Sequence, residues 1–292
     1  RDVVNLHIDL INKHGEFSYK VKTTAQWEKL KRYAALGLVS AVAESELASI
    51  EKKNKEKENS AGSAAFDAFN PIIEKSSAYN MALKIFSNKE VAPKKLPVAG
   101  GKYSIGKDEQ GADYSPYKMV ELSDFLIDET EVTALNYSLC VMAGACTEAV
   151  SYAKDQYCTF RMEGGSMLPI NCVDWRQARD YCQFAGGRLP TEAEWEAAAK
   201  GTLGKSFPWG EDKPTECDKA VFSTSKGDGC GENMPMQTGA LHAGASDVGA
   251  LDMAGNVWEW TSDFYQKDAY KFIISKNPQG PSNGTMRVIR GG

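Results

Sequence analysis

The stretch RLPTEAEWEAAAKG, residues 188–201, carries the strongest local signal for structure in this chain. Thr191 is followed three residues later by Glu194, the pattern of a capping box, in which each side chain satisfies a backbone amide at the start of a helix. Trp195 and the alanines after it recur at helical spacing, and Gly201 suits the end of a helix. The stretch therefore predicts a short helix between Thr191 and Gly201, with its tryptophan and alanines facing a core.

A second helix is predicted immediately upstream, within VDWRQARDYCQFAGG, residues 173–187. Asp174 is a good N-cap residue, and Gly186 suits the position just after the last turn. Tyr181 and Cys182 belong to its predicted inward stripe. Outside these two helices the second part of the chain is rich in glycine and has few long periodic stretches.

Composition changes sharply near residue 92, and we expect two domains. Residues 1–92 hold 14 Lys+Arg and 12 Asp+Glu, whereas the remainder holds 20 and 27, together with all seven cysteines and five of the six tryptophans. Trp27, Leu30 and Ala34 follow one another at helical spacing. The predicted organisation is a helical N-terminal segment over 1–92 and a second domain over 93–292.

Charge and composition exclude some classes of function. The net charge is −5, so the chain lacks the basic surplus of a nucleic-acid-binding protein, and we expect no nucleic-acid partner. No apolar run approaches the ~20 residues that cross a bilayer, so membrane association would need an anchor that this chain does not contain. There are only three histidines, His7, His14 and His242, too few and too scattered to predict a multi-histidine metal site.

Several motifs in order along the chain resemble one known family. They are GGKYSIG (100–106), IDETEVT (127–133), residues 169–201, FPWG (207–210), GALDMAGNVWEWTSDFY (249–265) and RVIRGG (287–292). This set closely resembles the formylglycine-generating enzyme, or sulfatase-modifying factor, family over about residues 96–292. The resemblance implies an α+β fold, a variant of the C-type lectin fold with low regular secondary structure, here preceded by the N-terminal helical segment.

The resemblance does not by itself settle the function. Founding members oxidise a sulfatase cysteine to formylglycine with copper held by two cysteines, which lie just after the RVxRGG strand. This sequence stops at Gly292, the second glycine of that motif, so we predict no catalytic residue in it and copper only if the catalytic segment follows downstream. Iron-dependent relatives use a cluster of three histidines, and the spacing of His7 and His14 does not match it.

The leading hypothesis is therefore an extracytoplasmic, non-catalytic binding or assembly module. Its N-terminal helices would dock on a protein partner. Two alternatives are a copper-dependent formylglycine-generating oxidase whose catalytic cysteines follow residue 292, and a variable ligand-binding protein of a diversity-generating retroelement.

The resemblance also implies a structural calcium site in the turn before the WEW strand. The implied ligands are the side chains of Asp252 and Glu259 and the carbonyls of Gly255 and Val257, which are the hard oxygen donors that calcium prefers. The alternative interpretation is a core strand in which Glu259 forms a salt bridge.

Other family features match less well or carry no chemistry. A second family calcium site lies near residues 217–228, where Val221 replaces the usual asparagine and only Asp218 and Asp228 could compensate. The tryptophans of the motifs could be read as a sugar-binding platform, but they are predicted to be core residues. They are Trp175, Trp195, Trp209, Trp258 and Trp260.

Clustered cysteines without CxxC pairs predict disulfides and an oxidising compartment, which is periplasmic, cell-surface or secreted. Cys217 and Cys230 flank one polar loop and are natural partners. Three pairings are possible for the next four cysteines, of which we favour Cys146–Cys158 with Cys140–Cys172. In the family, the cysteine equivalent to Cys182 pairs with one in a closing strand that would follow Gly292, so Cys182 is predicted to be unpaired.

Overall fold

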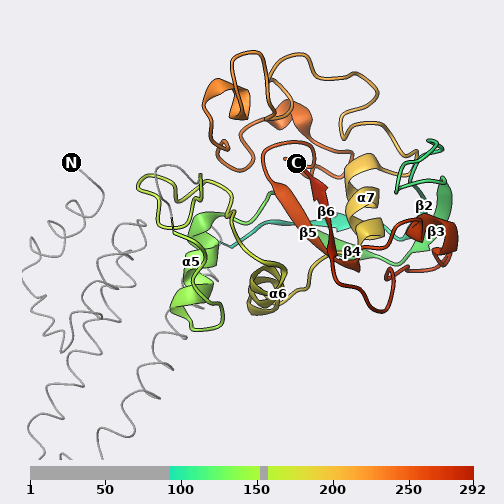
Figure 1. Cartoon of the computed structure of the whole chain (residues 1–292), viewed down its shortest axis with the longest axis horizontal. Helices are drawn as coiled ribbons and strands as arrows, with labels where there is room; N and C mark the ends of the chain where they lie inside the picture. Colours follow the sequence, from blue (N-terminus) through green and yellow to red (C-terminus); the bar gives the residue numbers. More distant parts are fainter. Residues whose placement is uncertain (1–91, 152–156) are drawn as a thin grey trace, which may run out of the picture. The chain divides into compact units, whose positions relative to one another are not determined.

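The computed structural model describes residues 92–151 and 157–292, so the predicted helical segment lies outside the described residues except for Ala92. The chain divides into two compact units. The larger combines Pro93–Thr133 with Leu168–Gly292, and the other includes Ala134–Met167. Figure 1 shows the described part of each, and the two are treated separately below.

The larger unit contains short strands and short helices joined by long irregular loops. The strands are β1 (Lys95–Val98), β2 (Gly101–Ile105), β3 (Lys118–Leu122), β4 (Phe125–Asp128), β5 (Trp258–Phe264) and β6 (Arg287–Gly291). They form three antiparallel pairs, β1 with β4, β2 with β3, and β5 with β6. The helices are α6 (Trp175–Phe184), α7 (Glu192–Lys200) and α8 (Ala269–Phe272), with 3₁₀ turns η1 (Gly229–Gly231) and η2 (His242–Gly244). Among the described residues, no helix combines the length and hydropathy of a membrane span.

Both predicted helices form, and α6 and α7 begin directly after their predicted N-cap residues, Asp174 and Thr191. In α7 the amide of Glu194 donates to the Thr191 hydroxyl at 3.1 Å, and the Thr191 amide donates to the Glu194 carboxylate at 2.8 Å. In α6 the Asp174 side chain accepts from the Gln177 amide at 2.9 Å, and Gly186 follows in the left-handed region at φ +73°. The chain therefore enters and leaves each helix by local hydrogen bonding.

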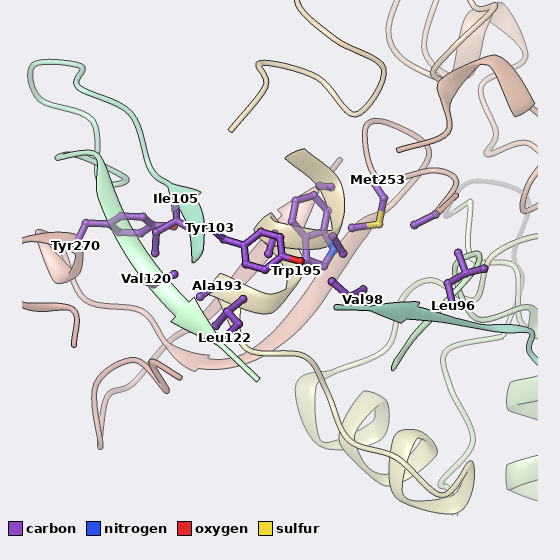
Figure 2. Packing of buried hydrophobic residues seen from close by; sticks show 14 residues of the cluster. Leu96, Val98, Tyr103, Ile105, Val120, Leu122, Ala193, Trp195, Met253 and Tyr270 are labelled. Atoms are coloured by element: carbon purple, nitrogen blue, oxygen red, sulfur yellow. The ribbon is translucent and has the colours of Figure 1, made fainter. Parts of the chain in front are cut away.

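The hydrophobic core of the larger unit surrounds α7. Trp195 is 4% exposed, and the two alanines that share its face, Ala198 and Ala199, are buried as predicted. α7 lies against β2, β5 and β6 (Figure 1). Figure 2 shows the buried side chains in a continuous row from Tyr270 through Tyr103 and Trp195 to Leu96.

Of the five tryptophans predicted to be core residues, only Trp195 is buried. Trp175, Trp209 and Trp260 are half-buried, and the prediction is wrong for Trp258, which is 62% exposed. Side chains alternate between the two faces of a strand. Its neighbour Glu259 turns toward α7 and accepts a hydrogen bond from Trp195 Nε1 at 3.1 Å. Trp258 therefore points to the opposite, outer face of the β5–β6 pair.

The described part of the smaller unit is built around α5 (Ala134–Met142). The Tyr137 ring packs edge-on against Phe160, with centroids 6.0 Å apart, and its hydroxyl donates to the Thr147 carbonyl at 2.8 Å. A tight turn follows α5, in which the Cys146 amide donates to the Cys140 carbonyl at 3.2 Å.

That turn decides a disulfide pairing that spacing left open. Cys140 is bonded to Cys146 with a Cα–Cα distance of 5.2 Å, so the favoured pairing of Cys146 with Cys158 and Cys140 with Cys172 is wrong. Cys158 and Cys172 are disulfide-bonded as well. The predicted Cys217–Cys230 bridge is present, and Cys182 is a free thiol, as predicted.

Candidate metal centre

The candidate site is the turn that leads into β5, residues 252–259. Asp252 and Asn256 adopt positive φ values of +58° and +63°, which short polar side chains tolerate, and Gly255 adopts +86°. A Cβ atom at Gly255 would lie only 2.2 Å from the Val221 carbonyl oxygen. Glycine is therefore required at this position on two independent grounds.

The two predicted carboxylate ligands flank this turn. Asp252 is 8% exposed, and its Oδ2 accepts from the Gly239 amide at 2.5 Å. Glu259 lies at the second position of β5, bonded through Oε2 to Trp195. Its cross-strand partner is Arg290, but that guanidinium pairs with carboxylates of α7. Within residues 92–151 and 157–292 no salt bridge to Glu259 forms, unlike the alternative that the sequence left open.

The predicted carbonyl donors belong to the same turn. A Cβ atom at Gly291, on the neighbouring strand β6, would lie 3.5 Å from both Glu259 Oε1 and the Val257 carbonyl oxygen. These two oxygens therefore lie beside the same point of β6, the position that a side chain at residue 291 would occupy. The Gly292 amide also approaches the Val257 carbonyl, at 3.4 Å.

A third carboxylate, Glu131, lies beside the turn and was not predicted. It belongs to the IDETEVT motif, is 9% exposed, and accepts hydrogen bonds from the Val257 amide at 3.1 Å and from Asn256 Nδ2 at 2.7 Å. The sequence marked this segment as a family motif but carried no sign of a contact 125 or 126 residues away.

Burial and mutual repulsion oppose ionisation of these three acids. Burial raises the pKa of Glu131 well above its usual range, and the charges of Glu259 and Asp252 raise it further. Burial also raises the pKa of Glu259 to about 7, against the hydrogen bond from Trp195, and Asp252 adds to the rise. Burial also raises the pKa of Asp252. A nearby cation would relieve this repulsion.

The donor chemistry fits Ca²⁺. Calcium accepts carboxylate and carbonyl oxygens in irregular geometry, and the turn offers both kinds. In the described ranges no three side chains of His, Cys, Asp or Glu are arranged to hold a metal, so backbone carbonyls would have to complete any coordination shell. The expected set of Asp252, Gly255, Val257 and Glu259 has this mixed character.

The loop over 217–231, where the family has a second calcium site, is closed here by a disulfide bond. Its ends are joined by the Cys217–Cys230 disulfide, with a Cα–Cα distance of 6.1 Å. Asp228 accepts a hydrogen bond from the Ser223 hydroxyl at 2.5 Å, and the apolar side chain of Val221 is buried. Asp218, the other acid of this loop, is exposed.

Cys182 is the free thiol of the described residues. Burial raises its pKa to about 12, and the charge of Asp128 adds to the effect. A thiol with this pKa stays protonated at neutral pH and is a weak nucleophile and metal ligand.

Comparison with known proteins extends the resemblance. Residues 83–292 match the sulfatase-modifying factor enzyme 1-like domain. The serine/threonine-protein kinase pkn1 of Chlamydia pneumoniae is 31% identical over 209 residues, which cover 67% of this chain and 32% of that protein. The formylglycine-generating enzyme of Thermomonospora curvata is 29% identical over 257 residues, covering 70% of this chain and 84% of that enzyme.

The chain thus spans about a third of the length of the kinase that it matches. Among solved structures, Treponema denticola variable protein 1 shares the fold, with a TM-score of 0.51 and 22% identity over 68% of this chain and 82% of that one. The predicted α+β, C-type-lectin-like fold is therefore confirmed. The chain belongs to the family of sulfatase-modifying factor enzyme 1-like domains.

Proposed function

We propose that this domain is a calcium-stabilised binding or assembly module that works outside the cytoplasm. The observation that carries the proposal is the set of three carboxylates, Glu131, Asp252 and Glu259, gathered around one turn with pKa values raised by burial. Buried carboxylates are stable as charged groups only when a cation or several donors compensate them. A calcium ion held by Asp252, Glu259 and two carbonyls would supply that charge.

Disulfides support the proposed location. Structural disulfides persist in oxidising compartments and are rare in the cytosol. Cys140–Cys146 and Cys217–Cys230 each close a short irregular loop, the kind of segment that a small core stabilises least. The predicted protein partner, and docking through residues 1–92, form part of the same proposal and rest on the sequence.

Calcium binding can be tested by thermal unfolding and titration calorimetry. We expect one calcium site, and a melting temperature that is several degrees higher with calcium than with EDTA, since a ligand at 100 times its Kd adds about 2.7 kcal/mol. Asp252→Ala should abolish the difference, while Asp218→Ala, at an exposed acid of the disulfide-closed loop, should retain it. Equal melting temperatures of the unaltered protein in calcium and EDTA would refute the site.

A second candidate function is copper-dependent formylglycine formation. It is favoured by the match to 84% of the Thermomonospora curvata enzyme. Copper(I) needs soft thiolate ligands, and the free thiol among the described residues is the protonated Cys182. The thiolates would therefore have to come from elsewhere in the protein. Mass spectrometry of a cysteine-containing sulfatase peptide after incubation with copper-loaded protein decides: a formylglycine product establishes the oxidase, and an unchanged peptide favours the binding module.

A further inference from the structure

Glu131 holds the candidate calcium turn from the side of the connection after β4. Its carboxylate spans two consecutive residues of the turn, with Oε1 accepting from the Val257 amide and Oε2 from Asn256 Nδ2. Both oxygens therefore face protein donors. Glu131 is almost fully buried, so water does not compete freely for these hydrogen bonds.

The side chain of Asn256 can present its amide to Glu131 in only one orientation. Asn256 Oδ1 accepts from the Met236 amide at 2.9 Å, and Nδ2 donates to the Met236 carbonyl at 3.3 Å as well as to Glu131. Rotating the amide by half a turn would oppose donor to donor and acceptor to acceptor at Met236. The residue at position 131 must therefore be an acceptor toward Asn256.

Two backbone amides orient two successive peptide units of the turn, and Glu131 accepts the hydrogen bond from the second of them. The Asn256 amide donates to the Val221 carbonyl at 2.9 Å, and the N–H and C=O of one trans peptide point in opposite directions. The Gly255 carbonyl, a predicted ligand, is thus directed away from Val221. The next peptide unit, which joins Asn256 to Val257, is held by the hydrogen bond from the Val257 amide to Glu131, and it lies between the Gly255 and Val257 carbonyls.

Only a carboxylate meets both demands at position 131. It offers an acceptor on each oxygen, whereas a glutamine side chain offers one acceptor and one donor. Glutamine could still accept from Val257, but its NH₂ group would then face the NH₂ group of Asn256.

We propose that Glu131 is a positioning residue of the calcium site: it fixes the peptide unit that lies between the two carbonyl donors, Gly255 and Val257, and does not itself bind the ion. This inference rests on the proposed function. Residues that orient metal ligands typically change metal affinity by about 10- to 100-fold when they are mutated. We therefore expect Glu131→Gln to weaken calcium binding by at least about tenfold.

The experiment is calcium titration calorimetry on the full chain, well below the melting temperature of each variant. Glu131→Asp keeps the negative charge but shortens the side chain by one methylene, so its calcium affinity should also fall about tenfold. The matched control is Glu129→Gln, the same change two residues earlier at an acid paired with Lys94. Its calcium affinity should stay within twofold of that of the unaltered protein.

Each outcome has a distinct meaning. Wild-type calcium affinity in folded Glu131→Gln, even with a lower melting temperature in EDTA, would make Glu131 merely structural and overturn the inference. Wild-type affinity in Glu131→Asp alone would show that only charge matters, which overturns it too. If the unaltered protein binds no calcium, the proposed function itself fails.

A further variant keeps the test decisive if Glu131→Gln does not fold. Asn256→Gly removes the side-chain contact to Glu131 while tolerating φ +63° at that position. It should lower calcium affinity at least threefold, and unchanged affinity would again overturn the role of Glu131.

Discussion

Glu196 of α7 and the three acids around the turn before β5 are buried carboxylates whose charge the fold compensates to different degrees. On α7, Glu196 is completely buried, yet its oxygens accept from the Gly106 amide, Lys200 Nζ and the Tyr270 hydroxyl, each at 2.8 Å. Burial alone would raise its pKa, but the positive charges of Arg290 and Lys200 hold the pKa of Glu196 below its usual value. In the turn before β5, the pKa values of Glu131, Asp252 and Glu259 are all raised.

The difference separates a structural motif from a candidate site. Around Glu196 the chain supplies its own cations, including Arg290 from the RVIRGG motif at 3.3 Å, so the charge is compensated within the fold. Around the turn the donors are amides and one indole, which compensate charge only in part. The second arrangement is the one that an external cation would complete.

The largest effect should come from removing the compensated charge. Glu196→Gln removes the buried charge that compensates both Lys200 and Arg290 and leaves Arg290 with Glu192, 3.5 Å away; breaking a buried ion pair in this way costs about 3–5 kcal/mol. Urea unfolding in EDTA measures the loss. Glu121→Gln, at an exposed acid 3.8 Å from Lys276, is the control and should change stability by less than about 1 kcal/mol. Similar losses for the two variants would contradict the comparison.

The next effect concerns the backbone of the turn. Gly255→Ala places a Cβ against the Val221 carbonyl and forces a left-handed φ on alanine, which together should lower the free energy of unfolding by about 3 kcal/mol. Gly187→Ala is the control, because its Cβ would meet nothing closer than 3.7 Å. Thermal unfolding of both proteins with and without calcium checks this, and equal stability would show that the turn readily rearranges.

A pH series sharpens the comparison within α7 itself. Burial raises the pKa of Glu192 from 4.5 to about 7, although Arg290 opposes the shift. The folded protein therefore holds this proton more tightly than the unfolded chain, so the contribution to stability is complete below about pH 4.5 and disappears as the pH rises through 7. Relative to the unaltered protein, Glu192→Gln should gain roughly 2 kcal/mol between pH 5 and pH 8. Melting temperatures measured at each pH check this. A difference between the two proteins that stays constant from pH 5 to pH 8 would contradict the raised pKa of Glu192.

The smallest effect tests the cap of α7. Thr191→Ala removes the hydroxyl that accepts from the Glu194 amide and should cost about 1 kcal/mol, with no change in calcium sensitivity. Thr202→Ala, at an exposed position just after the helix, is the control. Urea midpoints compare the two, and a loss of calcium response in Thr191→Ala would show that α7 and the turn before β5 are not independent.

Local features of the fold were predictable because their physics is local. The capping boxes at Asp174 and Thr191 join residues three apart, and the Cys217–Cys230 bridge closes one short loop. For each of these, spacing along the chain already constrains distance in space. Asp252 and Glu259 were expected from the family resemblance, and their role as ligands stays a prediction.

Features that depend on distant segments required the tertiary structure. The sequence by itself determined the family and the two helices. The folded chain decided that Glu131 reaches Val257, that Trp258 faces outward, and that Arg290 compensates Glu196 and not Glu259. The physical reason is that the compensation of a buried charge depends on which distant groups packing brings within a few ångströms, and spacing along the chain does not encode that distance.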